Sequence, residues 1–195
     1  MDALMSYQAG VKNVVASSGT ALTHGENSHL KLIKRYTTNL SLCLDSDRAG
    51  DMATKKSILL ALGEGFRVTG IEIQDKECKD PADLIRKNPS IWTQTANESK
   101  PILEILFNRA LSKFDRLSVE GKKSIINEMA PFVKKLATYT EKNHWIGQLA
   151  IELRTKEEVI ANDIQISKEE LEITDTAQNK TQPPTEPDQL NETLL

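Results

Sequence analysis

Three short apolar segments alternate with helical patterns in the first part of the chain. The segments are Val11–Ala16, Leu40–Leu44 and Phe66–Ile73, and each is short enough for a buried strand. Between them, apolar residues recur at helical spacing over residues 2–9, from about 27 to 34 and from about 47 to 62. Strands that alternate with helices predict a parallel, doubly wound α/β sheet with right-handed crossovers.

The pattern changes after Pro101, where three helical stretches follow one another: about 102–111, 119–136 and 141–154. Trp145, Leu149 and Leu153 recur at i, i+4 and i+8 of the last stretch, which predicts a face that points into a core. We expect a small all-α bundle packed on the sheet domain.

These patterns predict three parts: a sheet domain over residues 1–98, a helical subdomain over residues 99–163, and a tail over residues 164–195. The tail is polar, contains Pro183-Pro184 and Pro187, and has no aromatic residue. Such a composition cannot bury a core, so we expect a disordered linker or tail.

Charge is distributed unevenly along the chain. Residues 157–195 hold ten acidic and two basic residues, a net of −8, so the overall net charge of −3 leaves +5 for residues 1–156. A mildly basic body with an acidic tail permits contact with nucleic acid but does not require it.

Composition also limits the environment of the protein. No apolar run approaches about 18 residues, the length that predicts a membrane span, and the first residues lack the pattern of a signal peptide. Cys43 and Cys78 are the only cysteines, with no CxxC and no zinc-ligand spacing. We expect a cytoplasmic protein with no zinc site and no membrane partner.

The strongest candidate for chemistry is an acidic pair that follows the apolar segment Leu40–Leu44. Asp45 and Asp47 are spaced i, i+2 where the expected strand ends, and the carboxyl ends of parallel strands are where ligands bind. Carboxylate oxygens suit Mg²⁺ or Mn²⁺. The alternative is that Asp45 only ends the strand and Asp47 caps the next helix.

Two further clusters follow the other expected strands, at Ser17-Ser18-Gly19-Thr20 and at Lys79-Asp80-Pro81-Ala82-Asp83. All three clusters would meet at the carboxyl edge of the sheet. Carboxylates there would share a divalent metal, and the small residues Gly19 and Thr20 would let a phosphate approach closely.

These clusters and their neighbours carry a resemblance to a known family. The residues concerned are Met1-Asp2-Ala3-Leu4, Gln8-Ala9-Gly10, Asn13-Val14-Val15-Ala16, Gly19-Thr20-Ala21-Leu22, His29-Leu30-Lys31-Leu32, Arg35-Tyr36, Asp45-Ser46-Asp47-Arg48-Ala49-Gly50 and Lys79-Asp80-Pro81-Ala82-Asp83-Leu84-Ile85-Arg86-Lys87. Through them the chain resembles the bacterial replicative DNA primases, in their Toprim metal-binding domain and the helical subdomain after it. The Asp-x-Asp motif is common to all Toprim proteins, whereas the Gly-Thr-Ala-Leu and Asp-Pro-x-Asp-Leu-Ile-Arg contexts indicate a primase.

The resemblance implies a fold and a chemistry. The fold is an incomplete Toprim domain, with a Rossmann-like parallel sheet, followed by the all-α bundle and the acidic tail. The activity is synthesis of short RNA primers from nucleoside triphosphates on single-stranded DNA, with Mg²⁺ or Mn²⁺ held by Toprim carboxylates. Asp45 and Asp47 are then metal ligands and catalytic residues, and Asp80 is a third ligand or orients the metal cluster.

Other roles remain open at this point. The family often has a second acid two residues after the position of Asp80; here Asp83 either substitutes for it or only caps a short helix. Arg48 either touches a triphosphate or is an ordinary helix residue. Lys31, Lys34 and Arg35 form a basic helical face that either lies near nucleic acid or is simply solvated.

The chain also departs from the family pattern. That pattern runs Glu-Gly-Tyr-Met-Asp, with the glutamate at the end of a first strand, and this sequence begins at Met1-Asp2. We therefore expect an internal piece of a primase that is inactive alone, without the zinc ribbon and without the domain that binds the replicative helicase. The alternatives are a non-catalytic Toprim docking module and another Toprim enzyme, such as a nuclease.

Overall fold

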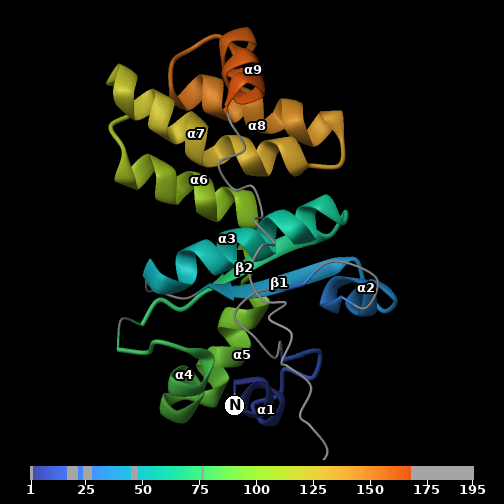
Figure 1. Cartoon of the computed structure of the whole chain (residues 1–195). Helices are drawn as coiled ribbons and strands as arrows, with labels where there is room; N and C mark the ends of the chain where they lie inside the picture. The colour runs from blue at the N-terminus through green and yellow to red at the C-terminus, as the bar shows by residue number, and fades with distance from the viewer. Residues whose placement is uncertain (1, 17–21, 24–27, 45–47, 76, 168–195) are drawn as a thin grey trace, which may run out of the picture.

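A computed structural model describes residues 2–16, 22–23, 28–44, 48–75 and 77–167 of the chain (Figure 1). In chain order its elements are α1 (Asp2–Gln8), α2 (His29–Lys34), β1 (Asn39–Leu44), α3 (Arg48–Gly63), β2 (Arg67–Glu72), α4 (Pro81–Lys87), α5 (Pro89–Asn97), β3 (Lys100–Pro101), α6 (Ile102–Lys113), α7 (Val119–Lys135), α8 (Tyr139–Glu152) and α9 (Glu157–Ile166). The expected mixed α/β architecture, with helices dominating after Pro101, is confirmed.

A small sheet forms the centre of the first half, in the order β1-β2-β3. β1 and β2 are parallel, with Asn39 opposite Arg67 and Leu44 opposite Glu72. The crossover between them is α3, as the alternation of strands and helices predicts. β3 pairs antiparallel with β2 over two residues, and the sequence analysis did not predict it.

Each face of the sheet packs against a different core. Leu44 and Val68 belong to the larger core, which also contains α3, α6 and the helices above them, whereas Ile71 packs with α4 and α5 in a smaller core (Figure 1). In β1, Leu40, Leu42 and Leu44 pack in the larger core, while Asn39 and Ser41 on the other face are exposed. That second face is therefore covered toward the carboxyl end of the strand, where Cys43 packs against the smaller core.

Gly70 explains how α6 approaches β2 so closely. A Cβ atom at this position would lie 2.6 Å from Cδ1 of Ile105 and 3.1 Å from Cδ1 of Ile102. The missing side chain therefore makes room for the first turns of α6 against the sheet.

The helix boundaries have local causes. Ser28, Asp80, Asn88 and Ser118 are N-caps whose side chains accept a backbone N–H from the first turn. Thr138 begins α8 with a full capping box, because its hydroxyl accepts from Glu141 N and the Glu141 carboxylate accepts from Thr138 N. At the other end of α1, Gly10 has a φ of +107°, as expected of the glycine that ends a helix.

The helical region shares the larger core with the sheet. Phe132 and Leu149 are buried together with Val68 and Ile58 in one continuous cluster. The predicted core role of the Trp145 stripe is confirmed: the Trp145 ring packs edge-on against Phe107 at 5.9 Å between centroids. Within the described part of the chain, no helix is long and apolar enough to cross a membrane.

One ion-pair cluster joins three helices across this core. Glu128 on α7 binds Lys55 of α3 at 2.7 Å and Lys113 of α6 at 3.2 Å. The side chains of Glu128 and Lys55 are only 20% and 16% exposed. Despite its burial, the pKa of the Glu128 carboxyl is lowered, because both lysine ammonium groups stabilise its charged form.

Three features differ from the sequence-based expectation. Val11–Ala16 does not form a strand: it has no ladder partner among the described residues, and Val15 is 70% exposed. An apolar run needs a neighbouring strand as well as a pattern. The helices α5 and α9 were not predicted, and the expected start of the tail at residue 164 falls inside α9, where Ile164 is buried.

We expect the Glu128→Gln variant to lose about 1–2 kcal/mol of unfolding free energy at pH 7, because Lys55 and Lys113 lose their ion pairs with Glu128. The stabilisation by the Glu128 carboxylate is complete above its ordinary pKa of 4.5 and is lost as the pH falls through the lowered value of the folded state. The difference in unfolding free energy between wild type and variant should therefore be smaller when urea unfolding is repeated near pH 3. The exposed Glu120→Gln on the same helix is the control and should change stability by less than about 0.5 kcal/mol.

We expect Gly121→Ala to destabilise the protein by about 1–3 kcal/mol, although alanine is the better helix former. A Cβ atom at Gly121 would lie 1.9 Å from the carbonyl oxygen of Asp115, which is backbone and cannot rotate away. Gly147→Ala is the matched control, since its Cβ atom would meet only the end of the Glu157 side chain at 3.4 Å. Equal urea midpoints for the two variants would contradict the close approach of the Asp115 carbonyl.

Candidate metal edge of the sheet

The carboxyl ends of β1 and β2 lie side by side. Leu44 ends β1 and is the register partner of Glu72, which ends β2. Asp45 and Asp47, the predicted metal ligands, come directly after Leu44 but lie outside the described residues. The parallel register thus places β1, which Asp45 and Asp47 follow, beside β2, which the loop to Asp80 follows.

The loop from β2 to α4 is held by one lysine. Nζ of Lys87, at the end of α4, donates to Asp75 at 2.7 Å and to Glu77 at 2.9 Å. Asp75 also accepts a hydrogen bond from the backbone N–H of Glu77 at 3.0 Å. The loop is therefore tied to the far end of the helix that it precedes.

These contacts shift the protonation of the loop side chains. The hydrogen bond from Lys87, followed by the one from the Glu77 N–H, lowers the pKa of Asp75. The bonds to Asp75 and Glu77 raise the pKa of Lys87. Cys78 points into the smaller core, and burial raises the pKa of its thiol. Lys87 and Asp75 are thus a charged pair at neutral pH, and Cys78 is a neutral thiol.

Asp80 begins α4 as its N-cap. Its Oδ1 accepts a hydrogen bond from the backbone N–H of Asp83 at 2.8 Å, and Pro81 occupies the first turn. An N-cap carboxylate fixes its own direction relative to the helix axis and benefits from the positive end of the helix dipole. The structure thereby gives Asp80 a structural role that the sequence analysis did not weigh.

Asp83 is one turn inside the helix and does not cap it. Its Oδ2 accepts from the backbone N–H of Lys79 at 3.3 Å, and its Oδ1 binds Arg86 at 3.1 Å. The expected alternative in which Asp83 caps a helix starting at Leu84 is wrong, because α4 starts at Pro81 with Asp80 as its cap. Both oxygens of Asp83 are therefore engaged locally.

Within the described residues, no three His, Cys, Asp or Glu side chains are arranged to hold a metal ion. Among the predicted ligands, only Asp80 belongs to this part of the chain. Its carboxylate is the hard oxygen donor that Mg²⁺ and Mn²⁺ prefer, and its side chain makes one hydrogen bond through Oδ1 within the described part. The donor chemistry fits such an ion, with Asp45 and Asp47 needed to complete the site.

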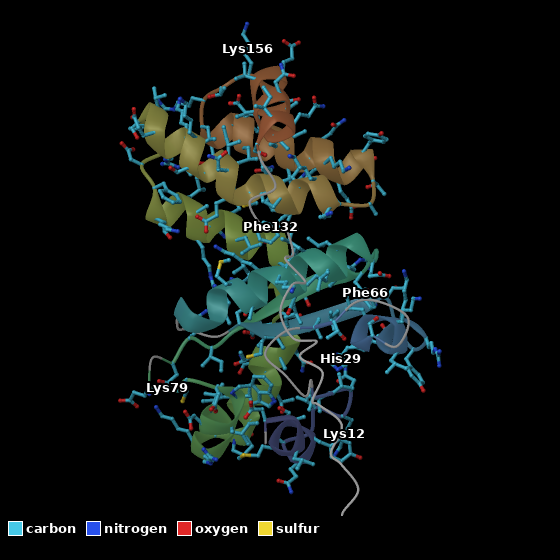
Figure 2. The ribbon with its side chains drawn as sticks, in the orientation of Figure 1. Lys12, His29, Phe66, Lys79, Phe132 and Lys156 are labelled. Carbon is cyan, nitrogen blue, oxygen red and sulfur yellow. The ribbon has the colours of Figure 1, made fainter. Side chains whose placement is uncertain are left out.

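The basic residues of the sequence analysis lie at the opposite edge. Lys31, Lys34 and Arg35 belong to α2 and its C-cap, directly before β1, so they lie where the strands begin. In Figure 2, Phe66, which precedes β2, and Lys79, which precedes Asp80, lie at opposite ends of the sheet. The structure therefore does not bring these three residues together with Asp80.

The remaining predicted residues have no described side chain. Gly19 and Thr20 lie outside the described residues, and Arg48 is the first residue of α3. Sequence reasoning gave no role to Lys87, because its partners Asp75 and Glu77 are twelve and ten positions away. Only the folded loop shows that the three belong together.

A shallow cavity of about 530 Å³ opens between α5 and the end of α1, away from this edge. Its lining consists of Ala9, Pro89, Ser90, Thr93, Gln94, Asn97 and Glu98. None of the predicted site residues contributes to it.

We expect Lys87→Met to raise the rate of hydrogen–deuterium exchange of the backbone amides of residues 77–79 by about two- to fivefold. This modest increase corresponds to the small stability that exposed ion pairs contribute. The reason is that Lys87 joins Asp75 and Glu77 of this loop to the end of α4. Arg86→Met is the control, because among the described residues Arg86 pairs with Asp83 of its own helix and with no acid of residues 75–77. Equal exchange in both variants would show that the core contact of Cys78 is sufficient to hold the loop.

Sequence comparison agrees with this architecture. Residues 1–85 match the Toprim-like family. The DNA primase of Clostridium acetobutylicum is 29% identical over 177 residues, which are 88% of this chain and 29% of that protein. The DNA primase of Listeria monocytogenes is 32% identical over 169 residues, 86% of this chain and 26% of that protein.

Solved structures show the same fold. A DNA primase domain from Pseudomonas aeruginosa superposes with a TM-score of 0.67 at 22% identity, covering 84% of this chain and 51% of that one. The E. coli primase catalytic core gives a TM-score of 0.64 at 25% identity, covering 80% and 50%. The chain spans less than a third of the length of the curated relatives described here. It therefore carries a Toprim-like domain over residues 1–85 and, through this domain and the helices that follow, is similar to part of the bacterial DNA primases.

Proposed function

We propose that this chain supplies the metal-binding part of a DNA primase, which makes short RNA primers on single-stranded DNA. The observation that carries the proposal is the parallel register of β1 and β2. In this register the last residue of β1, Leu44, immediately precedes Asp45 and lies beside Glu72. Glu72 ends β2, and the loop that leads to Asp80 starts there. Carboxylates that follow adjacent parallel strands are suited to share a metal.

In this proposal Asp45, Asp47 and Asp80 hold Mg²⁺ or Mn²⁺. Asp80 is suited to orient the ion, because its N-cap hydrogen bond to Asp83 fixes one oxygen and the direction of the other. Asp83 plays a supporting part, since Lys79 and Arg86 already engage its oxygens. When bound, the metal supplies positive charge that stabilises the triphosphate during nucleotidyl transfer.

The substrates follow from the same reasoning. Gly19, Thr20 and Arg48 are proposed to lie against the nucleoside triphosphate, since a small-residue loop and a helix start accommodate phosphate. One structural relative is a primase catalytic domain bound to single-stranded DNA, which supports a DNA template. The replicative helicase is proposed as a partner of the complete primase.

We expect the purified chain to bind Mn²⁺ and to make no primers by itself, since it spans 29% of a primase relative. Electron paramagnetic resonance titration measures free Mn²⁺ directly. Asp45→Asn should weaken binding by tenfold or more, because a hard cation loses a charged ligand.

Two variants at one position separate the metal role of Asp80 from its cap role. Asp80→Asn keeps an N-cap residue, so stability should stay within a few tenths of a kcal/mol while Mn²⁺ binding weakens. Asp80→Ala should lose both binding and about 1 kcal/mol of stability. Mn²⁺ affinity unchanged by Asp45→Asn and by Asp80→Asn would overturn the proposed site. Primer synthesis by the chain alone would overturn the expectation that it needs the rest of a primase.

A further inference from the structure

A cluster of cations with one exposed aromatic ring lies at the edge of the sheet where the strands begin. We call this cluster the α2 patch. It consists of Lys31, Lys34, Arg35, Tyr36, Arg67 and Lys135. We propose that the α2 patch binds the sugar-phosphate backbone of single-stranded nucleic acid, with Tyr36 stacking on a base.

The patch is assembled by contacts between three elements. Lys31, Lys34 and Arg35 are three and four positions apart and therefore share one face of α2 and its C-cap. Lys34 donates to the backbone carbonyl of Glu64, just after α3. The backbone N–H of Arg67 donates to the carbonyl of Thr38 at 2.8 Å, which places the start of β2 beside the end of α2.

Lys135 joins the patch from the helical region. Its Cδ lies 3.9 Å from the position of a Cβ atom at Gly63, the last residue of α3. Gly63 immediately precedes Glu64, which Lys34 contacts. The last turns of α7 and of α2 therefore both lie near the C-terminal end of α3 (Figure 1).

The charge of this surface is strongly one-sided. All five cations are exposed, and the segments 28–44 and 61–71 contain one acidic residue, Glu64, which Lys34 approaches at 3.8 Å. A surface of this kind attracts a polyanion through phosphate contacts and release of counterions. An ordinary solvated helix face usually intersperses both signs of charge.

Tyr36 distinguishes the patch from a simple basic face. Its side chain is 90% exposed, while its backbone N–H donates to the carbonyl of Ile33 at 2.9 Å and holds the residue in place. An exposed ring that directly follows a cation in a basic segment is a combination that single-strand binding proteins use, because unpaired bases stack on aromatic side chains. A duplex offers no free base face, so the ring favours a single strand.

This inference goes beyond the proposed metal chemistry and rests on it only for the choice of DNA as the probe. The α2 patch contains none of the proposed metal ligands. It lies at the other end of a six-residue strand, about 20 Å from the carboxyl edge. A single strand bound there would leave the carboxylates free for a nucleotide.

Fluorescence anisotropy with a labelled 12-nucleotide single strand tests the proposal on the full chain, at low salt and with EDTA in place of metal. Lys31→Glu combined with Arg35→Glu should weaken binding at least tenfold. It should also reduce the slope of log affinity against log salt concentration by the equivalent of about one phosphate contact or more. Tyr36→Ala should weaken binding about fivefold or more, whereas Tyr36→Phe should bind like wild type.

The control carries the same charge change elsewhere on the surface, at the half-buried Lys122 and the exposed Lys123. Lys122→Glu combined with Lys123→Glu on α7 should alter binding less than threefold. Equal losses in both double variants, a wild type that binds no single strand, or tighter binding to phosphatidylserine vesicles or duplex DNA would each overturn the proposal. Mn²⁺ titration of the same variants keeps the two proposals apart, since changes in the α2 patch should leave metal affinity unchanged.

Discussion

The structure depends on the parallel pairing of β1 with β2. This ladder sets the direction of the α3 crossover, separates the two cores, and brings Leu44 level with Glu72. A slip of one residue would exchange the two faces, so that Leu44 would leave the larger core and Cys43 would enter it. The position of Asp45 relative to the loop that leads to Asp80 thus depends on apolar packing more than on any contact between polar groups.

The two edges of the sheet differ in charge. At the carboxyl edge the loop before α4 carries Asp75, Glu77 and Asp80, with Lys87 holding the first two. At the amino edge the cations of α2 predominate. This separation along the strands would give a bound nucleic acid and a bound cation different ends of the same small domain, so that neither competes with the other for its ligands.

Hydrophobic pattern was sufficient to predict β1, β2, α3 and the long helices, because the apolar positions of each element lie within a single continuous segment. It failed at Val11–Ala16, where strand formation depends on a neighbour that no local pattern specifies. In the candidate site, Asp80 was proposed from its place after an expected strand and from the family resemblance, whereas its cap geometry and the role of Lys87 required the folded loop. The proposal that Asp45 and Asp47 are metal ligands rests on their position directly after β1.

The shared core has a consequence for genetics. Met129 and Leu149 lie far along the chain from the acidic edge, yet they are fully buried in the cluster that also holds Leu44 and Val68. A single cooperative transition is expected when one cluster spans two regions. Conditional alleles of such a gene, in particular temperature-sensitive ones, should therefore map to the bundle as readily as to the acidic edge of the sheet.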